Sequence, residues 1–264
     1  LALLRDEGRL RLDDPLAAHL PVARYSPRFR DGKTVTLRDV LLHQSGFQSA
    51  GDYHEFPGAP PITPTDLLRS LITIPSVAVP GSSYVYSNAA FGLLGLIIEQ
   101  ASGEPYEPFI QRAVTAPLGL STAAFSLAEI PPADRAVSYS KSGTRLSPLF
   151  EVSLGAASAS GGLYLSVPDL ARWGAFHAEA YPPRDAPDTG PVSRATVREI
   201  LELYLDPAAV SAKSPTHHTL GWNAKLRCGA RFHWKAGALE EFSALVSFLP
   251  DHGIAIASAA NGRL

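Results

Sequence analysis

The apolar positions in the middle of the chain recur at helical spacing, and the longest such stretch runs from Asn88 to Gly103. Ser87 precedes it as a predicted N-cap, and Gly103 is a typical helix stop. Because a helix that is apolar on nearly all sides is buried in a core, packing should fix residues 86–88 at its start. A helix is already under way at Leu1, and shorter ones are predicted over residues 36–42, 66–72, 105–116, 166–173 and 193–205.

The last quarter of the chain changes to short apolar runs separated by turn residues. Pro250-Asp251-His252-Gly253 is a good hairpin turn between the last two of these runs. Strands are predicted over residues 222–226, 231–237, 242–249 and 254–259. An antiparallel sheet that follows a helical middle indicates an α+β fold. The segments 48–64 and 126–160, the second with weak strands, are predicted to be loops.

Composition and charge exclude several classes of protein. The 264 residues are 45% apolar and 18% charged, which is a globular and not a disordered composition. Lys and Arg number 23 against 25 Asp and Glu, so no basic excess exists to bind nucleic acid. No stretch reaches the roughly 18 apolar residues of a membrane span. Cys228 is the single cysteine, so no internal disulfide can form.

The chain contains no methionine and opens inside a helix. These two features predict that the 264 residues are a segment of a longer protein. The compartment, exported or cytoplasmic, and the oligomeric state are left open by the sequence.

Searches for the common nucleotide, metal and hydrolase motifs are negative. His217 and His218 are adjacent, so they cannot present two ligands on one helical face, and no metal or other cofactor is expected. Two tripeptides remain, Tyr86-Ser87-Asn88 before the buried helix and Lys235-Ala236-Gly237 on a strand. Taken alone, the first is an aromatic residue beside an N-cap and the second is an exposed strand lysine.

Taken together, the two tripeptides can carry chemistry. A lysine cation near a phenol favours the phenolate, so Lys235 could lower the pKa of Tyr86 and let it shuttle a proton for a serine nucleophile. Asn88 could hold the substrate. Gly237 would let a substrate backbone lie against the strand, and the N–H of Ala238 could stabilise an oxyanion.

The chain resembles the serine β-lactamase and penicillin-binding-protein superfamily, and within it the class C β-lactamase-like branch of esterases, transesterases and D-amino-acid peptidases. The resemblance covers most of the chain in the family's order. The matching stretches are EGRLRLDDPLAAHLP, TLRDVLLHQSGF, VPGSSYVYSNAAFGLLGLIIEQASGEPY, APLGLSTAAF, SGGLYLSVPDLARW and HWKAGALEEFSALVSFLPDHGIAIASAAN.

The resemblance implies a β-lactamase/transpeptidase-like fold with a discontinuous and incomplete sheet subdomain, residues 1–20 and 213–264, and a mostly helical subdomain, residues 21–212. It implies that Tyr86 and Lys235 are catalytic and that Asn88 contacts substrate. Ala236 replaces the family's usual threonine, so substrates without a carboxylate at that position become more plausible. Ser87, His233 and Trp234 are minor site candidates, with Trp234 as an apolar wall.

The family's Ser-x-x-Lys motif is expected before Leu1, because the helix that carries it is already under way there. Ser138-Tyr139-Ser140-Lys141 fits the motif but follows Tyr86 and lies in a turn-rich segment, so it is interpreted as a solvated loop. His43 and Ser45, which could resemble a base and a nucleophile, are interpreted as helix-termination residues.

The leading hypothesis is a serine hydrolase that acts through an acyl-enzyme on a small ester, amide or β-lactam. The 264 residues alone should then be nearly inert, since the nucleophile would lie outside them. The alternative is a non-catalytic scaffold or binding domain that has lost its nucleophile. A third reading, an unrelated hydrolase that uses His43 or His233, is the least favoured.

Overall fold

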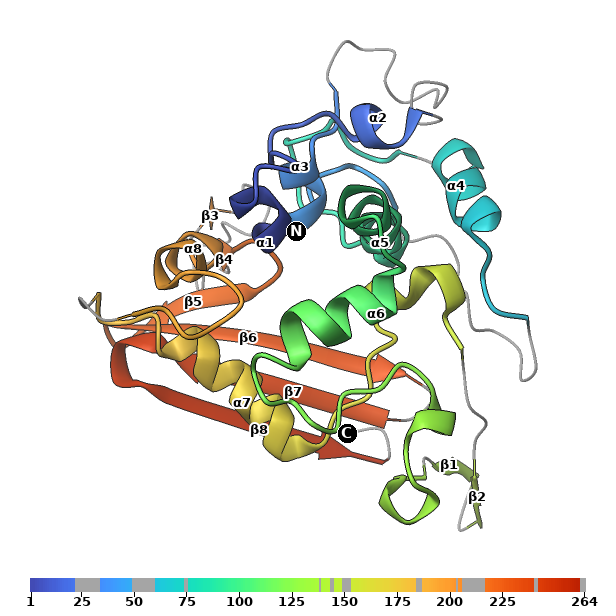
Figure 1. Ribbon diagram of the computed structural model, residues 1–264, viewed down its shortest axis with the longest axis vertical. Helices are drawn as coiled ribbons and strands as arrows, with labels where there is room; N and C mark the ends of the chain where they lie inside the picture. The colour runs from blue at the N-terminus through green and yellow to red at the C-terminus, as the bar shows by residue number, and fades with distance from the viewer. Residues whose placement is uncertain are drawn as a thin grey trace.

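A computed structural model gives the fold of the chain (Figure 1). It describes residues 1–21, 34–48, 60–73, 76–137, 139–142, 145–148, 153–183, 187–202, 204–205, 217–239 and 242–261.

The largest sheet is an antiparallel meander in which each strand pairs with the next one in sequence, in the order β3-β4-β5-β6-β7-β8. Its register is continuous, with Lys235 opposite Val246 on β7 and Val246 opposite Ala257 on β8. The strands are β3 (Tyr204–Leu205), β4 (His217–His218), β5 (Asn223–Arg227), β6 (Ala230–Leu239), β7 (Phe242–Leu249) and β8 (Ile254–Ala260). The predicted α+β class and antiparallel sheet are confirmed.

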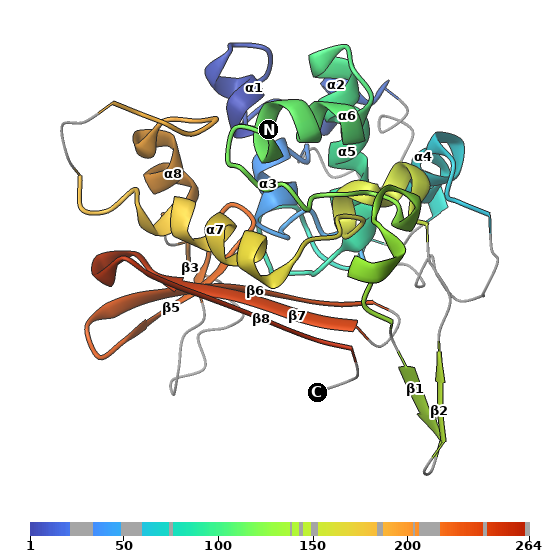
Figure 2. The same ribbon diagram turned by 60° about the horizontal axis from the view of Figure 1, so that its bottom comes forward.

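A group of helices from the first half of the chain packs beside this sheet (Figures 1 and 2). These helices share one hydrophobic core, to which Leu4, Leu37, Leu67 and Ile97 contribute fully buried side chains. The elements are α1 (Ala2–Asp6), α2 (Leu16–His19), α3 (Leu37–Leu41), α4 (Pro64–Thr73), α5 (Asn88–Ser102), α6 (Tyr106–Ile110) and the π-helical turn η3 (Gln111–Thr115).

Helix α5 lies in the middle of this core, as its apolar sequence predicts. The Ser87 hydroxyl accepts a hydrogen bond from the Ala90 N–H at 3.1 Å, so Ser87 is the N-cap. At the other end Gly103 adopts a left-handed conformation with φ 76°, which glycine alone adopts without strain. The capped and buried start of α5 therefore fixes the residues that precede it.

Two helices of the second half, α7 (Val167–Ala178) and α8 (Arg194–Ile200), pack with the sheet in a second core. A Cβ atom at Gly174 of α7 would lie only 3.0 Å from Val246 of β7, so glycine permits the close approach of helix and sheet. Trp173 of α7 and Trp222 before β5 belong to the same core, with ring centroids 6.5 Å apart.

The cores differ from the predicted division of the chain at two points. Helices α1 and α2, predicted to belong with the sheet, contribute Leu4 and Leu16 to the helical core. Helices α7 and α8, predicted to belong to the helical part, contribute Ala178 and Val197 to the core against the sheet. The boundaries of the two subdomains themselves stay a prediction.

Most predicted elements are present with shifted ends. The helix predicted over 193–205 ends at Ile200, and Tyr204–Leu205 is a strand because it pairs with His217–His218. The segment 126–160 contains short 3-10 helices, η4 (Leu127–Glu129), η5 (Pro132–Asp134) and η6 (Gly155–Ser160), and the hairpin of β1 (Tyr139–Ser142) and β2 (Arg145–Pro148). After β7 the predicted turn is the 3-10 helix η7 (Pro250–His252). Most of the loop 48–64 lies outside the described residues.

Two histidines are buried where the sheet meets its helices. The Nδ1 of His177 donates to the carbonyl of Trp173 at 2.9 Å, and the ring of His233 stacks on Phe248 at 5.3 Å. Burial lowers the pKa of each imidazole from 6.5 to about 4. Both side chains are therefore neutral in the folded protein at neutral pH.

We predict that the free energy of unfolding falls as the pH is lowered from 6.5 to 4. In that window the unfolded chain binds protons that the folded chain excludes, and each histidine then costs on the order of 3 kcal/mol in total. Urea unfolding at pH 7.0 and 4.5 measures the loss. Equal stability at the two pH values would contradict the prediction.

Candidate active site

Tyr86 and Lys235, predicted from separate tripeptides, lie close together in the structure. Tyr86 comes just before α5 in the helical group, and Lys235 lies on β6 of the sheet. The Nζ of Lys235 lies 5.4 Å from the ring centroid of Tyr86 and 5.7 Å from that of Phe91. This is the distance of a cation–π contact, so the lysine charge faces two aromatic rings.

The protonation of the pair differs from the sequence-based expectation. Burial raises the pKa of the Tyr86 phenol above 10, whereas the lysine was expected to lower it. Burial also lowers the pKa of Lys235, because its ammonium group is partly removed from water. The resting pair is therefore a neutral phenol beside a lysine that gives up its proton more readily than an exposed one.

His43 holds the segment that contains Tyr86. Its carbonyl accepts the N–H of Val85 at 2.6 Å, and its ring Nδ1 accepts the N–H of Ser87 at 3.2 Å. The His43 ring also lies 4.4 Å from the ring of Tyr86 and 4.5 Å from that of Phe91. His43 follows the C-cap of α3 in a left-handed conformation with φ 54°, so it does end a helix as predicted.

The contact of His43 with residues 85–87 was not predicted from the sequence. The side chain is buried, and desolvation, with smaller contributions from Lys235 and His218, lowers its pKa to about 3. An imidazole in this position is neutral. The available signal was the apolar sequence around a histidine that directly follows a short helix, but the sequence alone could not show that this turn meets residues 85–87.

The other candidates from the first tripeptide have distinct positions. Ser87 is fully buried, and its hydroxyl is hydrogen-bonded to the backbone of α5 as the N-cap. Asn88 is the first residue of α5 and is half-buried, two residues from Tyr86. Ser45 is fully buried, and its hydroxyl accepts the N–H of Phe47 at 3.3 Å, as expected for a turn residue.

Strand β6 extends past its neighbour β5 at the site. Pairing with β5 stops at Trp234, opposite Asn223, whereas pairing with β7 continues from Lys235 to Leu239. Among the described strands, residues 235–239 thus have one open edge, with backbone groups available to an extended ligand. Gly237 and Ala238 lie on this stretch and are exposed, and no atom lies within 4 Å of where a Cβ of Gly237 would be.

His233 and Trp234 are not part of this arrangement. His233 is fully buried, and its Nε2 donates to the carbonyl of Leu201 at 3.2 Å, which makes it a core residue. Side chains alternate along a strand, so Trp234 lies on the opposite face of the sheet from Lys235. There it contacts Lys225, whose Nζ is 5.4 Å from its ring. The apolar wall predicted from Trp234 is therefore wrong.

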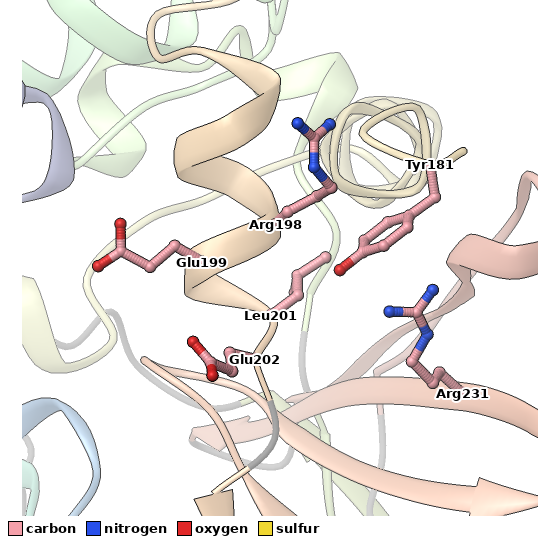
Figure 3. Close-up of a pocket in the computed structure, with 6 residues that line it drawn as sticks. All are labelled: Tyr181, Arg198, Glu199, Leu201, Glu202 and Arg231. Carbon is pink, nitrogen blue, oxygen red and sulfur yellow. The ribbon is translucent and has the colours of Figure 1, made fainter. Parts of the chain in front are cut away.

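Two of the hollows in the described part of the chain lie along β6. One, of about 460 Å³, is lined by residues 236–238, 243–245 and Ser258, at the end of β6 that follows Lys235. The second hollow, of about 390 Å³, lies between α8 and β6 (Figure 3), and Tyr86 and Lys235 line neither of the two. It is lined by Tyr181, Arg198, Glu199, Leu201, Glu202 and Arg231.

Two of the charged residues that line the second hollow, Arg231 and Glu199, have partners of opposite charge within the protein. Arg231 forms an ion pair with Asp251 and lies 4.0 Å over the ring of Tyr181, and Glu199 forms an ion pair with Arg5. This hollow is accordingly not the candidate active site. In the part of the chain that the structure describes, no group of three or more His, Cys, Asp or Glu side chains could hold a metal ion. Nor is any helix there long and apolar enough to cross a membrane.

Lys141 of the Ser-x-x-Lys sequence lies on β1, and Ser138 is outside the described residues. The hairpin of β1 and β2 projects away from the large sheet and from α5 (Figure 2). Residues 139–142 are thus a strand and not part of the predicted solvated loop, because they pair with residues 145–148. That the match at 138–141 has no part in the site stays a prediction.

Comparison with known proteins identifies the family. A family model described as Beta-lactamase matches residues 1–264, and the chain therefore belongs to the β-lactamase family. It is 32% identical over 176 residues to the D-alanyl-D-alanine-carboxypeptidase/endopeptidase AmpH of Escherichia coli (strain K12), over 66% of this chain and 44% of that protein. It is 34% identical over 144 residues to esterase EstB of Burkholderia gladioli, over 49% of this chain and 36% of that protein.

The similar solved structures agree with the fold. The penicillin-binding protein homologue of Pyrococcus abyssi, described as octameric, superposes with a TM-score of 0.81 and 25% identity, over 99% of this chain and 59% of that one. A class C β-lactamase superposes with a TM-score of 0.78 and 19% identity, over 100% of this chain and 73% of that one. The chain spans less than half the length of the two curated relatives.

We predict that Tyr86 ionises above pH 10, since burial raises the pKa of its phenol. Tyrosine ¹³Cζ NMR across an alkaline titration measures this directly, and the resonance missing from Tyr86→Phe assigns it. A midpoint well below 10 in the unaltered protein would contradict the raised pKa.

Proposed function

We propose that the protein is a serine hydrolase that acts through an acyl-enzyme on a small ester or amide. The observation that carries the proposal is the meeting of Tyr86 and Lys235 beside the open edge of β6. A proton-transfer group, a cation and a strand with free backbone groups are what acyl transfer needs around a nucleophile. Membership of a family whose similar members are named as a carboxypeptidase and an esterase supports the same class of reaction.

In the proposed reaction the serine oxygen bonds to the substrate carbonyl carbon, and the bond from that carbon to the leaving group breaks. The serine proton passes through the Tyr86 hydroxyl to the leaving oxygen or nitrogen. Water then attacks the acyl-enzyme, gives its proton back along the same route and frees the acid. The raised pKa of Tyr86 suits this role, because a neutral phenol both donates and accepts a proton.

Lys235 and the adjoining strand would act on the carbonyl side. The partly desolvated ammonium group is a strong local charge, and the N–H of Ala238 on the open stretch of β6 is the proposed oxyanion donor. Asn88, at the start of α5, would hold the substrate. Ala236 lacks a hydroxyl that could bind a substrate carboxylate, which favours esters and amides without one.

The nucleophile is proposed to come from a segment that precedes residue 1 in the parent protein. Residues 1–85 contain no Ser-x-x-Lys, and Tyr139, Ser140 and Lys141 of the match at 138–141 lie on β1. The same observation is what favours the second candidate function, a non-catalytic scaffold or binding domain without a nucleophile. Reading the residues upstream of Leu1 separates the two, since a Ser-x-x-Lys there supports the enzyme.

We predict that Tyr86→Phe and Lys235→Met each lower kcat/KM of the full-length parent for a p-nitrophenyl ester by about 10²–10⁴-fold, the usual worth of proton-transfer catalysis. Lys225→Met is the matched control, because Lys225 also lies over aromatic rings but on the other face of the sheet. It should keep full activity. Unchanged turnover in Tyr86→Phe would exclude the proposed proton route.

We also predict that the purified 264-residue chain releases no burst of p-nitrophenol or of hydrolysed nitrocefin. Removing the nucleophile from a comparable serine enzyme costs about a million-fold in turnover. A stoichiometric burst from this chain would show that the nucleophile lies within residues 1–264 and would overturn its proposed position.

A further inference from the structure

We propose that His43 is a positioning residue, whose neutral imidazole holds Tyr86 in place for proton transfer. The proposal rests on the proposed function for its catalytic consequence, but its structural part stands independently. His43 belongs to neither tripeptide that defines the site, and it reaches the site from the end of α3.

The first support is a pair of hydrogen bonds that flank Tyr86. His43 accepts the N–H of Val85 through its carbonyl and the N–H of Ser87 through its ring Nδ1. One residue thus accepts hydrogen bonds from the residues directly before and after Tyr86, which fixes the backbone at the tyrosine. The left-handed backbone of His43 permits this, since it turns the chain directly after α3.

The second support is the contact between rings. The His43 ring lies against both Tyr86 and Phe91, and Tyr84 meets its edge at 5.5 Å. Tyr86 is 44% exposed, and the His43 ring packs against the buried part of its side chain. The same two rings, Tyr86 and Phe91, face the Lys235 ammonium group, so His43 also sets the surface on which the cation rests.

The third support is the protonation state that the bonds require. Nδ1 can accept the Ser87 N–H only without a proton, so the proton of the neutral ring is on Nε2. Nε2 is buried and has no hydrogen-bond partner within the described chain. The charged or titratable groups that face the ring are Lys235, His218, Tyr84 and Tyr86. No anion is among them, so nothing in that set would stabilise an imidazolium.

A buried donor without a partner is unusual in a folded protein and calls for an explanation. A purely apolar side chain would fill the space between Tyr86 and Phe91 without leaving such a donor. Such an apolar side chain would lack an acceptor for the Ser87 N–H, which His43 provides through Nδ1. A neutral histidine that accepts the Ser87 N–H at Nδ1 must carry its proton on Nε2, and among these aromatic rings that N–H finds no acceptor.

The test compares His43→Asn with His43→Phe. The Oδ1 of asparagine can take the place of Nδ1, and asparagine tolerates a left-handed backbone. Phenylalanine keeps the ring and loses the acceptor. The first readout is amide hydrogen exchange at Ser87, relative to Gly103, whose N–H bonds to Glu99 at the far end of α5. We expect His43→Phe to lose at least tenfold of the Ser87 protection and His43→Asn to keep it.

The second readout is the ¹⁵N spectrum of the histidine rings in the unaltered protein. It should show His43 neutral, with Nδ1 unprotonated and Nε2 protonated, from pH 8 down to 5. A ring protonated on Nδ1, or cationic within that range, would overturn the proposal, and this holds even where a variant fails to fold. Ser87 protection that survives in a folded His43→Phe protein would overturn it too.

The third readout is turnover of a p-nitrophenyl ester by the full-length parent. His43→Phe should lower kcat by about 10–100-fold with KM changed less than threefold, and His43→Asn should restore most of kcat. Equal activity of both variants, in a parent that turns over the ester, would overturn the catalytic consequence. A parent with no turnover at all would refute the proposed hydrolase instead, while the exchange and ¹⁵N readouts would still decide the role of His43.

Discussion

The burial of α5 is the constraint on which the arrangement of the site depends. This helix is apolar on nearly every side, so packing against the surrounding helices fixes its position and direction. Its first turn is capped by Ser87, and the chain just before it is bonded to His43. A tyrosine in an ordinary loop would sample many orientations. At this position the backbone on either side of Tyr86 is hydrogen-bonded to His43, and the Tyr86 ring packs against the buried ring of His43.

The second half of the site comes from another core. Lys235 lies on β6 where its open edge begins, and the position of the sheet is set by α7, α8 and the aromatic side chains between them. The tyrosine and the lysine therefore belong to two separately packed groups and meet where these groups face each other. Their distance depends on how the helical group and the sheet are docked.

The elements with a strong local signal could be predicted from the sequence. The buried helix with its two caps, the strands of β5 to β8 and the two tripeptides are of this kind, since each depends on residues close together in the chain. The end of α8 could not be predicted, because Tyr204–Leu205 becomes a strand only by pairing with His217–His218. The face on which Trp234 lies could also be predicted, because side chains alternate along a strand and Trp234 is next to Lys235.

The electrostatics of the site were predicted in the wrong direction for a physical reason. The sequence shows that a phenol and an ammonium group can meet, but it does not show how much water each loses. Partial burial raises the pKa of the phenol and lowers that of the amine, so desolvation opposes the effect expected from the charge. The role of His43 was hidden for a related reason, since its partners lie more than forty residues away in the chain.

The three tryptophans of the chain all lie in the half that contains the sheet, on α7, before β5 and on β6. The helical core around α5 contains none of them. Intrinsic fluorescence excited at the indole band therefore reports the loosening of the sheet half and is blind to the half that holds Tyr86. A difference between the fluorescence and circular-dichroism melting curves would reveal whether the two halves come apart together.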